Sequence, residues 1–350
     1  MLIDGIHVGL TATFYRDGSS YLRKLEHNVR RYSVTPAAGL VALTPGCEGA
    51  GLSFDEKKEA LKAVAATAAA EKVLLAGVSE SSVRSAVELA AAADEAGFDA
   101  LVLAAPADWA RLRSRAEVMV YFRAVADAVG LPVVLWSEAA PGCSLSVQEI
   151  AELSEHKSVI GLFDSGLSVE RYKAIAAATA EVRRDVAVTN IFRPVTGRMM
   201  IPELGGAADF VPSDMLGGSD VAMAMAMPQP TVKMRTKTVG FQVMAAGSVN
   251  GLLPLLEAGV AGVLPALGPC APQACHEVYA AFKDGNPGLA AEKGDRLTEA
   301  DALMAELGIA GVKYACDLNG YYGGVPRLPR LPLTGEERSR VEMVMGGLKN

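Results

Sequence analysis

The sequence lacks the features that mark several common classes of protein. Its 33 lysines and arginines stand against 40 aspartates and glutamates, a formal net charge of −7 at pH 7, so no positive excess is available for nucleic acid or an anionic membrane. No uninterrupted apolar run reaches the roughly 18 residues of a membrane-spanning helix. With 51% hydrophobic and 21% charged residues, we expect a soluble globular protein with a large core and with neither nucleic acid nor membrane as a partner.

Cysteine is also scarce, with five residues in a chain of 350. An odd number without paired clusters fits reduced thiols better than a disulfide framework. Only Cys270 and Cys275 lie close together, beside His276, and no second cluster completes a four-ligand zinc site, so we expect no metal and no cofactor. The first residues show no basic segment before an apolar stretch, and hence no secretory signal, so we expect a cytoplasmic protein.

Glycine-rich phosphate-binding motifs are absent as well. No GxGxxG follows the first predicted strand, which weakens a dinucleotide-binding Rossmann interpretation. No GxxxxGK[ST] occurs either, so the chain has no P-loop.

What the sequence does contain is a repeated alternation of short apolar runs with helical patterns. Six runs typical of buried strands begin at residues 6, 39, 72, 100, 132 and 158, separated by 33, 33, 28, 32 and 26 residues. Each interval accommodates one strand, one helix and two short loops. The capping boxes Ser53-x-x-Glu56 and Ser146-x-x-Glu149 mark two of the helix starts independently. The pattern predicts a βα repeat.

Two further strand candidates, 241–245 and 262–264, bring the count to eight, as in an α/β fold of the (β/α)8 TIM-barrel type. The sixth and seventh strand starts, 158 and 241, are 83 residues apart, about 50 more than one βα unit needs. We therefore predict an insertion at about 189–238, before the seventh strand, ordered and packed on the N-terminal face that serves stability. Residues 185–188 could instead form the seventh strand, which would place the insertion on the opposite face.

Helical patterns continue beyond the eighth predicted strand. The last of them opens with another capping box, Thr334-x-x-Glu337. We accordingly divide the chain into a barrel over 1–270 and a C-terminal helical extension over 271–350.

Several short motifs occur in a characteristic order. They are Thr-Pro-Gly-Cys-Glu at 44–48, Leu-Ala-Gly-Val at 75–78, Leu-Pro-Val-Val-Leu-Trp at 131–136, Ile-Gly-Leu-Phe-Asp-Ser at 160–165 and Val-Lys-Tyr-Ala-Cys at 312–316. In this order the chain resembles the dihydrodipicolinate synthase and N-acetylneuraminate lyase family of class I aldolases, over nearly its whole length outside the insertion. The resemblance implies a TIM barrel.

The resemblance also implies a mechanism, and the sequence departs from it. In the family, a lysine ending the sixth strand forms a Schiff base with pyruvate or another 2-oxo acid, and a tyrosine of the fifth strand relays protons. The amine is needed because an iminium withdraws electrons from the adjacent carbon. Here the lysine position is Phe163, the tyrosine position is Trp136, and the following asparagine is Ser137. We expect the usual chemistry to be absent; Lys157, Lys233, Lys237 and Lys313 are the candidates if the amine has migrated.

Residues at the carboxyl ends of the strands are candidates for ligand binding, because TIM-barrel active sites lie there. The ligand-binding candidates are Thr11, Thr44, Trp136, Ser137, Phe163 and Ser248. The threonine hydroxyls fit either recognition of a carboxylate or local turn hydrogen bonds. The two aromatic rings fit either core packing or a wall on which a ligand ring stacks.

Three carboxylates also follow predicted strands, namely Glu48, Glu138 and Asp164. They are candidates for a general acid–base set or an oxygen-rich metal site. Charges exposed on loops, or partners of helix ends, explain each of them equally well.

Two functions fit the sequence. The first is a lyase of the class I aldolase superfamily that acts on a small oxo acid or related metabolite with replaced catalytic residues. The second is a non-catalytic member that binds a metabolite or serves as a structural partner, so whether the chain is an enzyme stays open. By analogy with the tetramers common in the resembled family, we expect a homo-oligomer.

Overall fold

The computed structural model describes residues 1–106, 114–139, 144–201 and 232–348. Eight parallel strands close into a barrel in the order β1-β10-β9-β6-β5-β4-β3-β2. The barrel strands are β1 (Gly5–Gly9), β2 (Gly39–Ala42), β3 (Val73–Val78), β4 (Ala100–Ala104), β5 (Val133–Ser137), β6 (Val159–Asp164), β9 (Gln242–Gly247) and β10 (Gly262–Pro265). The predicted TIM barrel is confirmed.

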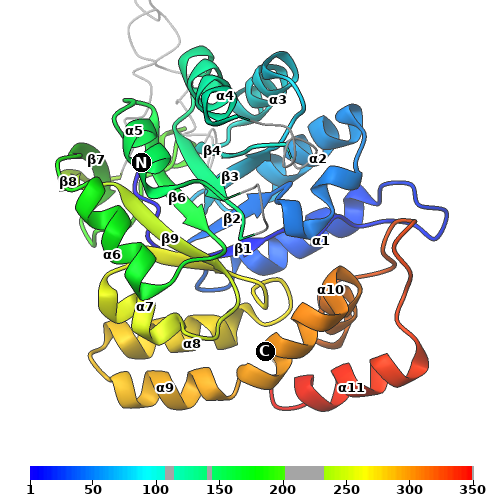
Figure 1. Cartoon of the computed structure of the whole chain (residues 1–350). Coiled ribbons are helices and arrows are strands. Elements are labelled where there is room, and N and C mark those ends of the chain that lie inside the picture. The colour runs from blue at the N-terminus through cyan, green and yellow to red at the C-terminus, as the bar shows by residue number, and fades with distance from the viewer. Residues whose placement is uncertain (107–113, 140–143, 202–231, 349–350) are drawn as a thin grey trace, which may run out of the picture.

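Helices alternate with these strands and cover the outside of the barrel (Figure 1). They are α1 (Leu22–Ser33), α2 (Phe54–Thr67), α3 (Val83–Ala96), α4 (Arg115–Ala128), α5 (Val147–Ser154), α6 (Val169–Ala178), α7 (Leu252–Ala258) and α8 (Pro272–Lys283). The predicted capping boxes form at α2 and α5, where Ser53 and Ser146 each exchange hydrogen bonds with the glutamate three residues later. These caps satisfy backbone N–H groups that a helix start leaves unpaired.

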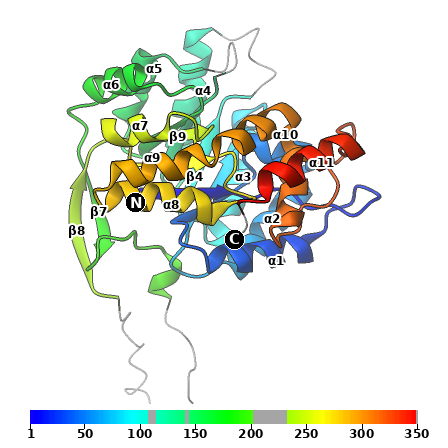
Figure 2. The same cartoon turned by 90° about the horizontal axis from the view of Figure 1, so that it is seen from below.

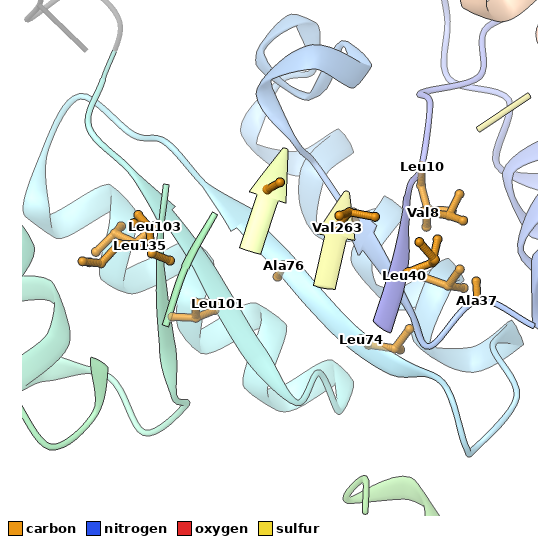
Figure 3. Close-up of a cluster of buried hydrophobic side chains, with 14 of the residues drawn as sticks. Val8, Leu10, Ala37, Leu40, Leu74, Ala76, Leu101, Leu103, Leu135 and Val263 are labelled. Carbon is orange, nitrogen blue, oxygen red and sulfur yellow. The ribbon is translucent and has the colours of Figure 1, made fainter. Parts of the chain in front are cut away.

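The core has two layers, because the strands are buried on both faces. The outer layer lies between strands and helices, and Figure 3 shows part of it, with Leu40, Leu74, Leu101 and Leu135 from consecutive strands. The inner layer fills the barrel itself and includes Trp136, Phe163, Met244 and Leu264. The barrel interior is thus a packed apolar core.

The seventh barrel strand is β9, which begins at Gln242 as the spacing predicts. The alternative, a barrel strand at 185–188, is wrong. These residues belong to β7 (Arg184–Thr189), which pairs antiparallel with β8 (Met234–Val239) in a separate two-stranded sheet. In β7 only Val186 and Val188 are buried, so the strand covers a single apolar face and lacks the two-sided burial of a barrel strand.

β7 and the described start of the insertion that follows it lie against the N-terminal face of the barrel. The Arg184 guanidinium donates to the Val159 carbonyl oxygen at the start of β6. The Thr196 hydroxyl donates to the Ala70 carbonyl, ahead of β3, and the Arg198 guanidinium donates 2.8 Å to the Gly97 carbonyl, ahead of β4. The rest of the predicted insertion, 202–231, lies outside the described residues.

Three helices follow α8, namely α9 (Pro287–Asp295), α10 (Thr298–Leu318) and α11 (Gly335–Met345). They form an outer layer beside α8, and α10 and α11 lie on the opposite side of the molecule from β7 and β8 in both views (Figures 1 and 2). The third predicted capping box, Thr334 with Glu337, opens α11. A kink at Gly308, with φ 60° and ψ −148°, divides α10 into two helical parts. Of the described helices, none is long and apolar enough to cross a membrane.

Candidate functional site

Phe163 fills the inside of the barrel near the carboxyl end of β6. Its side chain is 0% exposed, and its neighbours in register are Trp136 on β5 and Met244 on β9. The Phe163 ring centroid lies 6.2 Å from that of Trp136 and 5.9 Å from that of His7, which it meets edge to face. The phenyl ring therefore belongs to the packed interior.

His7 completes this interior from β1 and is itself fully buried. Its Nε2 lies 3.1 Å from the Ile3 carbonyl oxygen. Burial lowers the pKa of His7 to about 4, so the imidazole is neutral near pH 7. The centre of the barrel is thus uncharged.

Trp136, at the position of the expected tyrosine, is 9% exposed. Its indole N–H donates a 2.7 Å hydrogen bond to the Glu138 carboxylate. This bond satisfies the one polar group of the indole and engages Glu138, which the sequence identified as a catalytic candidate. An indole has no group that could relay protons as a tyrosine hydroxyl does.

Ser137 and Asp164 belong to one polar network at the ends of β5 and β6. The Arg171 guanidinium, from the first turn of α6, lies 2.7 Å from Asp164 Oδ2 and donates to the Ser137 hydroxyl at 3.3 Å. The Ser137 hydroxyl also accepts from the Leu145 amide, and Asp164 Oδ1 accepts from the Gly166 amide at 2.8 Å. These contacts fix the two loops that follow the strands. Arg171 was not among the residues predicted from the sequence.

Glu48 is occupied by a buried ion pair. Its Oε2 lies 2.5 Å from Lys313 Nζ, and the two side chains are 1% and 0% exposed. The Arg327 amide donates a 3.0 Å hydrogen bond to Glu48 Oε1. The Lys313 ammonium also donates to the Val325 carbonyl at 3.0 Å and lies 4.5 Å from the centroid of the Phe14 ring. Burial lowers the pKa of Lys313, while the Glu48 carboxylate opposes that shift.

The three candidate carboxylates are thus each engaged by a different partner: Glu48 by Lys313, Glu138 by Trp136 and Asp164 by Arg171. No group of three or more His, Cys, Asp and Glu side chains placed to hold a metal ion occurs within the part of the chain that the structure describes. Each carboxylate stabilises its own loop.

Thr11 and Thr44 have a different environment from the carboxylates. Both side chains are buried. The Thr11 hydroxyl has no hydrogen-bond partner among the described residues, whereas the Thr44 hydroxyl interacts with the Cys47 thiol. The Thr44 hydroxyl lies near the Cys47 thiol, whose pKa burial raises to about 11, so that the thiol stays protonated near pH 7. A cavity of only about 20 Å³ borders Thr11 and Cys47, about the size that one water molecule needs. Thr11 is thus the candidate whose hydroxyl is left without a partner among the described residues.

Ser248, the last candidate, follows β9. Its hydroxyl donates to the Asp301 carboxylate of α10, and the Val249 amide donates to the same oxygen at 3.1 Å. Ser248 therefore joins the barrel to the C-terminal helices.

None of the four lysines considered as migrated amines stands at the end of β6. Lys157 precedes β6, at the N-terminal face of the barrel. Lys233 and Lys237 belong to the insertion, and Lys313 is paired with Glu48. None of these four lysines therefore occupies the position, held here by Phe163, that the family resemblance assigns to the amine.

The amino-acid sequence of this chain is similar to those of known proteins. The chain matches the model of the dihydrodipicolinate synthetase family over residues 2–189. It is 25% identical over 347 residues to the L-threo-3-deoxy-hexylosonate aldolase of Hypocrea jecorina, covering 97% of this chain and 93% of that protein. It is 24% identical to the 4-hydroxy-tetrahydrodipicolinate synthase of Acidiphilium cryptum, covering 99% of each.

Solved structures share the fold. A putative dihydrodipicolinate synthetase from Pseudomonas aeruginosa superposes with a TM-score of 0.77 at 20% identity, covering 99% of this chain and all (100%) of that one. YagE from E. coli K12, a dihydrodipicolinic acid synthase family protein solved in complex with pyruvate, superposes with a TM-score of 0.75 at 22% identity, covering 99% of each.

Proposed function

This chain belongs to the dihydrodipicolinate synthetase family, and we propose that it binds a small oxo acid or related carboxylate at the carboxyl ends of its barrel strands without forming a Schiff base at β6. The observation that carries the proposal is Phe163, fully buried at the position where the family resemblance places the lysine. A phenyl ring offers neither a nucleophile nor a proton carrier. The aldol chemistry of the family therefore has no starting point at this position.

The second half of the mechanism is missing too. Trp136 stands at the relay position and its N–H is already bonded to Glu138. Catalytic groups that act as a unit lose their effect together, so either replacement alone would remove most of the rate. Non-catalytic binding is thus the function that the geometry supports best.

The ligand class rests on two observations. One structural relative, YagE, was solved with pyruvate. In this chain the buried Thr44 hydroxyl has the Cys47 thiol, a weak hydrogen-bonding group, beside it. A ligand carboxylate would be a stronger acceptor for the Thr44 hydroxyl.

Borohydride reduction in the presence of pyruvate, followed by intact-mass measurement, tests the absence of a Schiff base. We expect no adduct, whereas a stoichiometric adduct on any lysine would overturn the proposal. Thermal shift with a panel of oxo acids tests binding. Thr44→Val, which keeps the shape and removes the hydroxyl, should reduce any stabilisation by the ligand.

Turnover of an oxo acid without a borohydride-trapped adduct would instead favour the second candidate, a lyase with a different mechanism. That candidate is kept because curated relatives of this chain are named as aldolases. Binding without turnover supports the non-catalytic function. If no oxo acid binds, the binding function is wrong.

A homo-oligomeric state is also a proposal, and it rests on analogy with the family. Sedimentation at micromolar concentration should show a species larger than the 36.5 kDa chain. A single species at that mass would contradict it.

A further inference from the structure

A second cavity lies outside the barrel, between the loop after β1, the second part of α10 and the connection from α10 to α11. Its volume is about 310 Å³, within the range of small-molecule sites, roughly 300–1,000 Å³. The loop after β1 and the connection approach each other (Figure 1) and are joined by a 2.8 Å hydrogen bond from Arg327 Nε to the Gly18 carbonyl. The residues that matter for its chemistry are Phe14, Arg16, Tyr314, Asp317, Tyr322 and Arg338.

The walls of this cavity are held in place by their own hydrogen bonds. The Tyr322 hydroxyl donates to the Phe14 carbonyl at 3.2 Å, and the Tyr322 amide donates to Asn28 Oδ1 at 2.7 Å. Asp317 Oδ1 accepts from the Gly323 amide at 2.8 Å. The cavity is therefore formed before any ligand arrives, which lowers the entropic cost of binding.

Two guanidinium groups, both of exposed residues, line the cavity. Neither Arg16 nor Arg338 has a side-chain hydrogen bond or ion pair to any described residue; the Arg338 guanidinium lies over the Tyr314 ring, 5.6 Å from its centroid. Arg340, two residues further along α11, differs from Arg338 because its guanidinium is paired: it donates two 2.7 Å hydrogen bonds to the Glu306 carboxylate.

The other polar groups of the cavity are already engaged. The Tyr314 hydroxyl donates to Glu342 at 2.5 Å, and the Tyr322 hydroxyl donates to a carbonyl. The Asp317 carboxylate faces the amides of Gly323 and Gly324, which compensate part of its charge. The two arginines thus provide the free donors.

We propose that this cavity binds a small organic anion with a flat apolar body. The carboxylate or phosphate of the anion accepts hydrogen bonds from Arg16 and Arg338, because guanidinium groups match the geometry of both anions. The body packs on the rings of Tyr314 and Tyr322. The site is separate from the barrel interior, so it does not depend on the function proposed for the barrel.

Calorimetric titration of the full chain with phenylacetate, phenyl phosphate and the neutral phenylacetamide tests the proposal. Phenyl phosphate is not a carboxylate, and Thr44→Val alters only the barrel site, so failure at the barrel site and failure here are distinguishable. We expect at least one anion to bind and the amide to bind at least tenfold more weakly. Preference between the two anions tells a carboxylate site from a phosphate site.

Arg338→Gln and Arg16→Gln should each weaken binding of the anion about 10- to 100-fold, as expected for loss of a charge-assisted hydrogen bond. Arg340→Gln is the matched control on the same helix and should leave the affinity unchanged, as should Thr44→Val in the barrel. No binding by either anion, equal binding of the amide, or unchanged affinity in both cavity variants would overturn the proposal.

Discussion

We expect the loss of the buried ion pair between Glu48 and Lys313 to lower the free energy of unfolding substantially. Changing Lys313 to Met keeps the length of the side chain and removes its charge. Glu48, 1% exposed, would then remain buried with the Arg327 amide at 3.0 Å and the Arg330 guanidinium at 4.0 Å as its nearest compensation. Removing one partner of such a pair costs about 3–5 kcal/mol, because the other charge is left in a poor environment.

The expected change in Tm follows from this loss of unfolding free energy and from the length of the chain. An unfolding entropy of about 2.1 cal/mol/K per residue gives roughly 0.7 kcal/mol/K for a chain of this length. A loss of about 3–5 kcal/mol therefore lowers Tm by about 4–7 °C in differential scanning calorimetry.

A matched control and a double variant separate this charge effect from a packing defect. Lys293 forms a 2.7 Å pair with Glu277, but those side chains are 25% and 35% exposed. Lys293→Met should therefore cost less than about 1 kcal/mol. Adding Glu48→Gln to Lys313→Met should recover part of the loss, since it removes the stranded charge. A Lys313→Met shift no larger than that of the control would refute the reasoning.

Three further predictions concern other buried or paired charges. The hydrogen bonds from Arg327 lower the pKa of Glu56 to about 2 from 4.5, so Glu56→Gln should destabilise at pH 7, and its difference from wild type should shrink as pH falls through that window in denaturant titrations. Burial lowers the pKa of His7 from 6.5 to about 4, so the wild type should lose stability as pH falls across this range, and His7→Gln should flatten the loss. Arg198→Met leaves the buried Asp99 carboxylate without its 3.2 Å partner and should cost about 3 kcal/mol in urea unfolding; no effect would show that the insertion contributes little to stability.

The barrel strands were predictable because each is buried on both faces and so appears as a nearly continuous apolar run. The runs starting at 158 and 241 differ by a single residue from the first residues of β6 and β9. Residues 185–188 were ambiguous because a short apolar run also occurs in a strand with one buried face. The alternation there, with Asp185 and Ala187 exposed between buried valines, distinguishes such a strand from a barrel strand.

The partners of the candidate site residues could not be predicted in the same way. The sequence places Glu48 after the second strand, but nothing local indicates that Lys313, far along the chain, meets it. The pairing of Arg171 with Asp164 was easier to predict, because the first turn of the helix after β6 lies near the end of that strand. Such pairs join residues that are far apart in the sequence and meet only in the folded barrel. The periodicity of apolar residues predicts the strands and helices but not these long-range contacts.

Restoring the family's amine tests whether one residue separates this chain from an aldolase. In Phe163→Lys, the amine would stand at a position where the present side chain is 0% exposed, among Trp136, Met244 and a neutral His7. Desolvation favours the neutral amine, so a nucleophile would be present, at the cost of burying a polar group and losing the ring's packing.

The amine of Phe163→Lys would still lack the rest of the machinery. The relay position holds an indole bonded to Glu138, and the adjacent Asp164 is bound to Arg171. No group at either position is free to move a proton, and positioning without proton transfer leaves most of the barrier in place. We expect a lower melting temperature and no lyase turnover of oxo acids, measured by coupled assays on folded protein, for Phe163→Lys alone. Turnover by this single variant would show that a relay exists elsewhere in the barrel, and the view of Trp136 as the second lost element would be wrong.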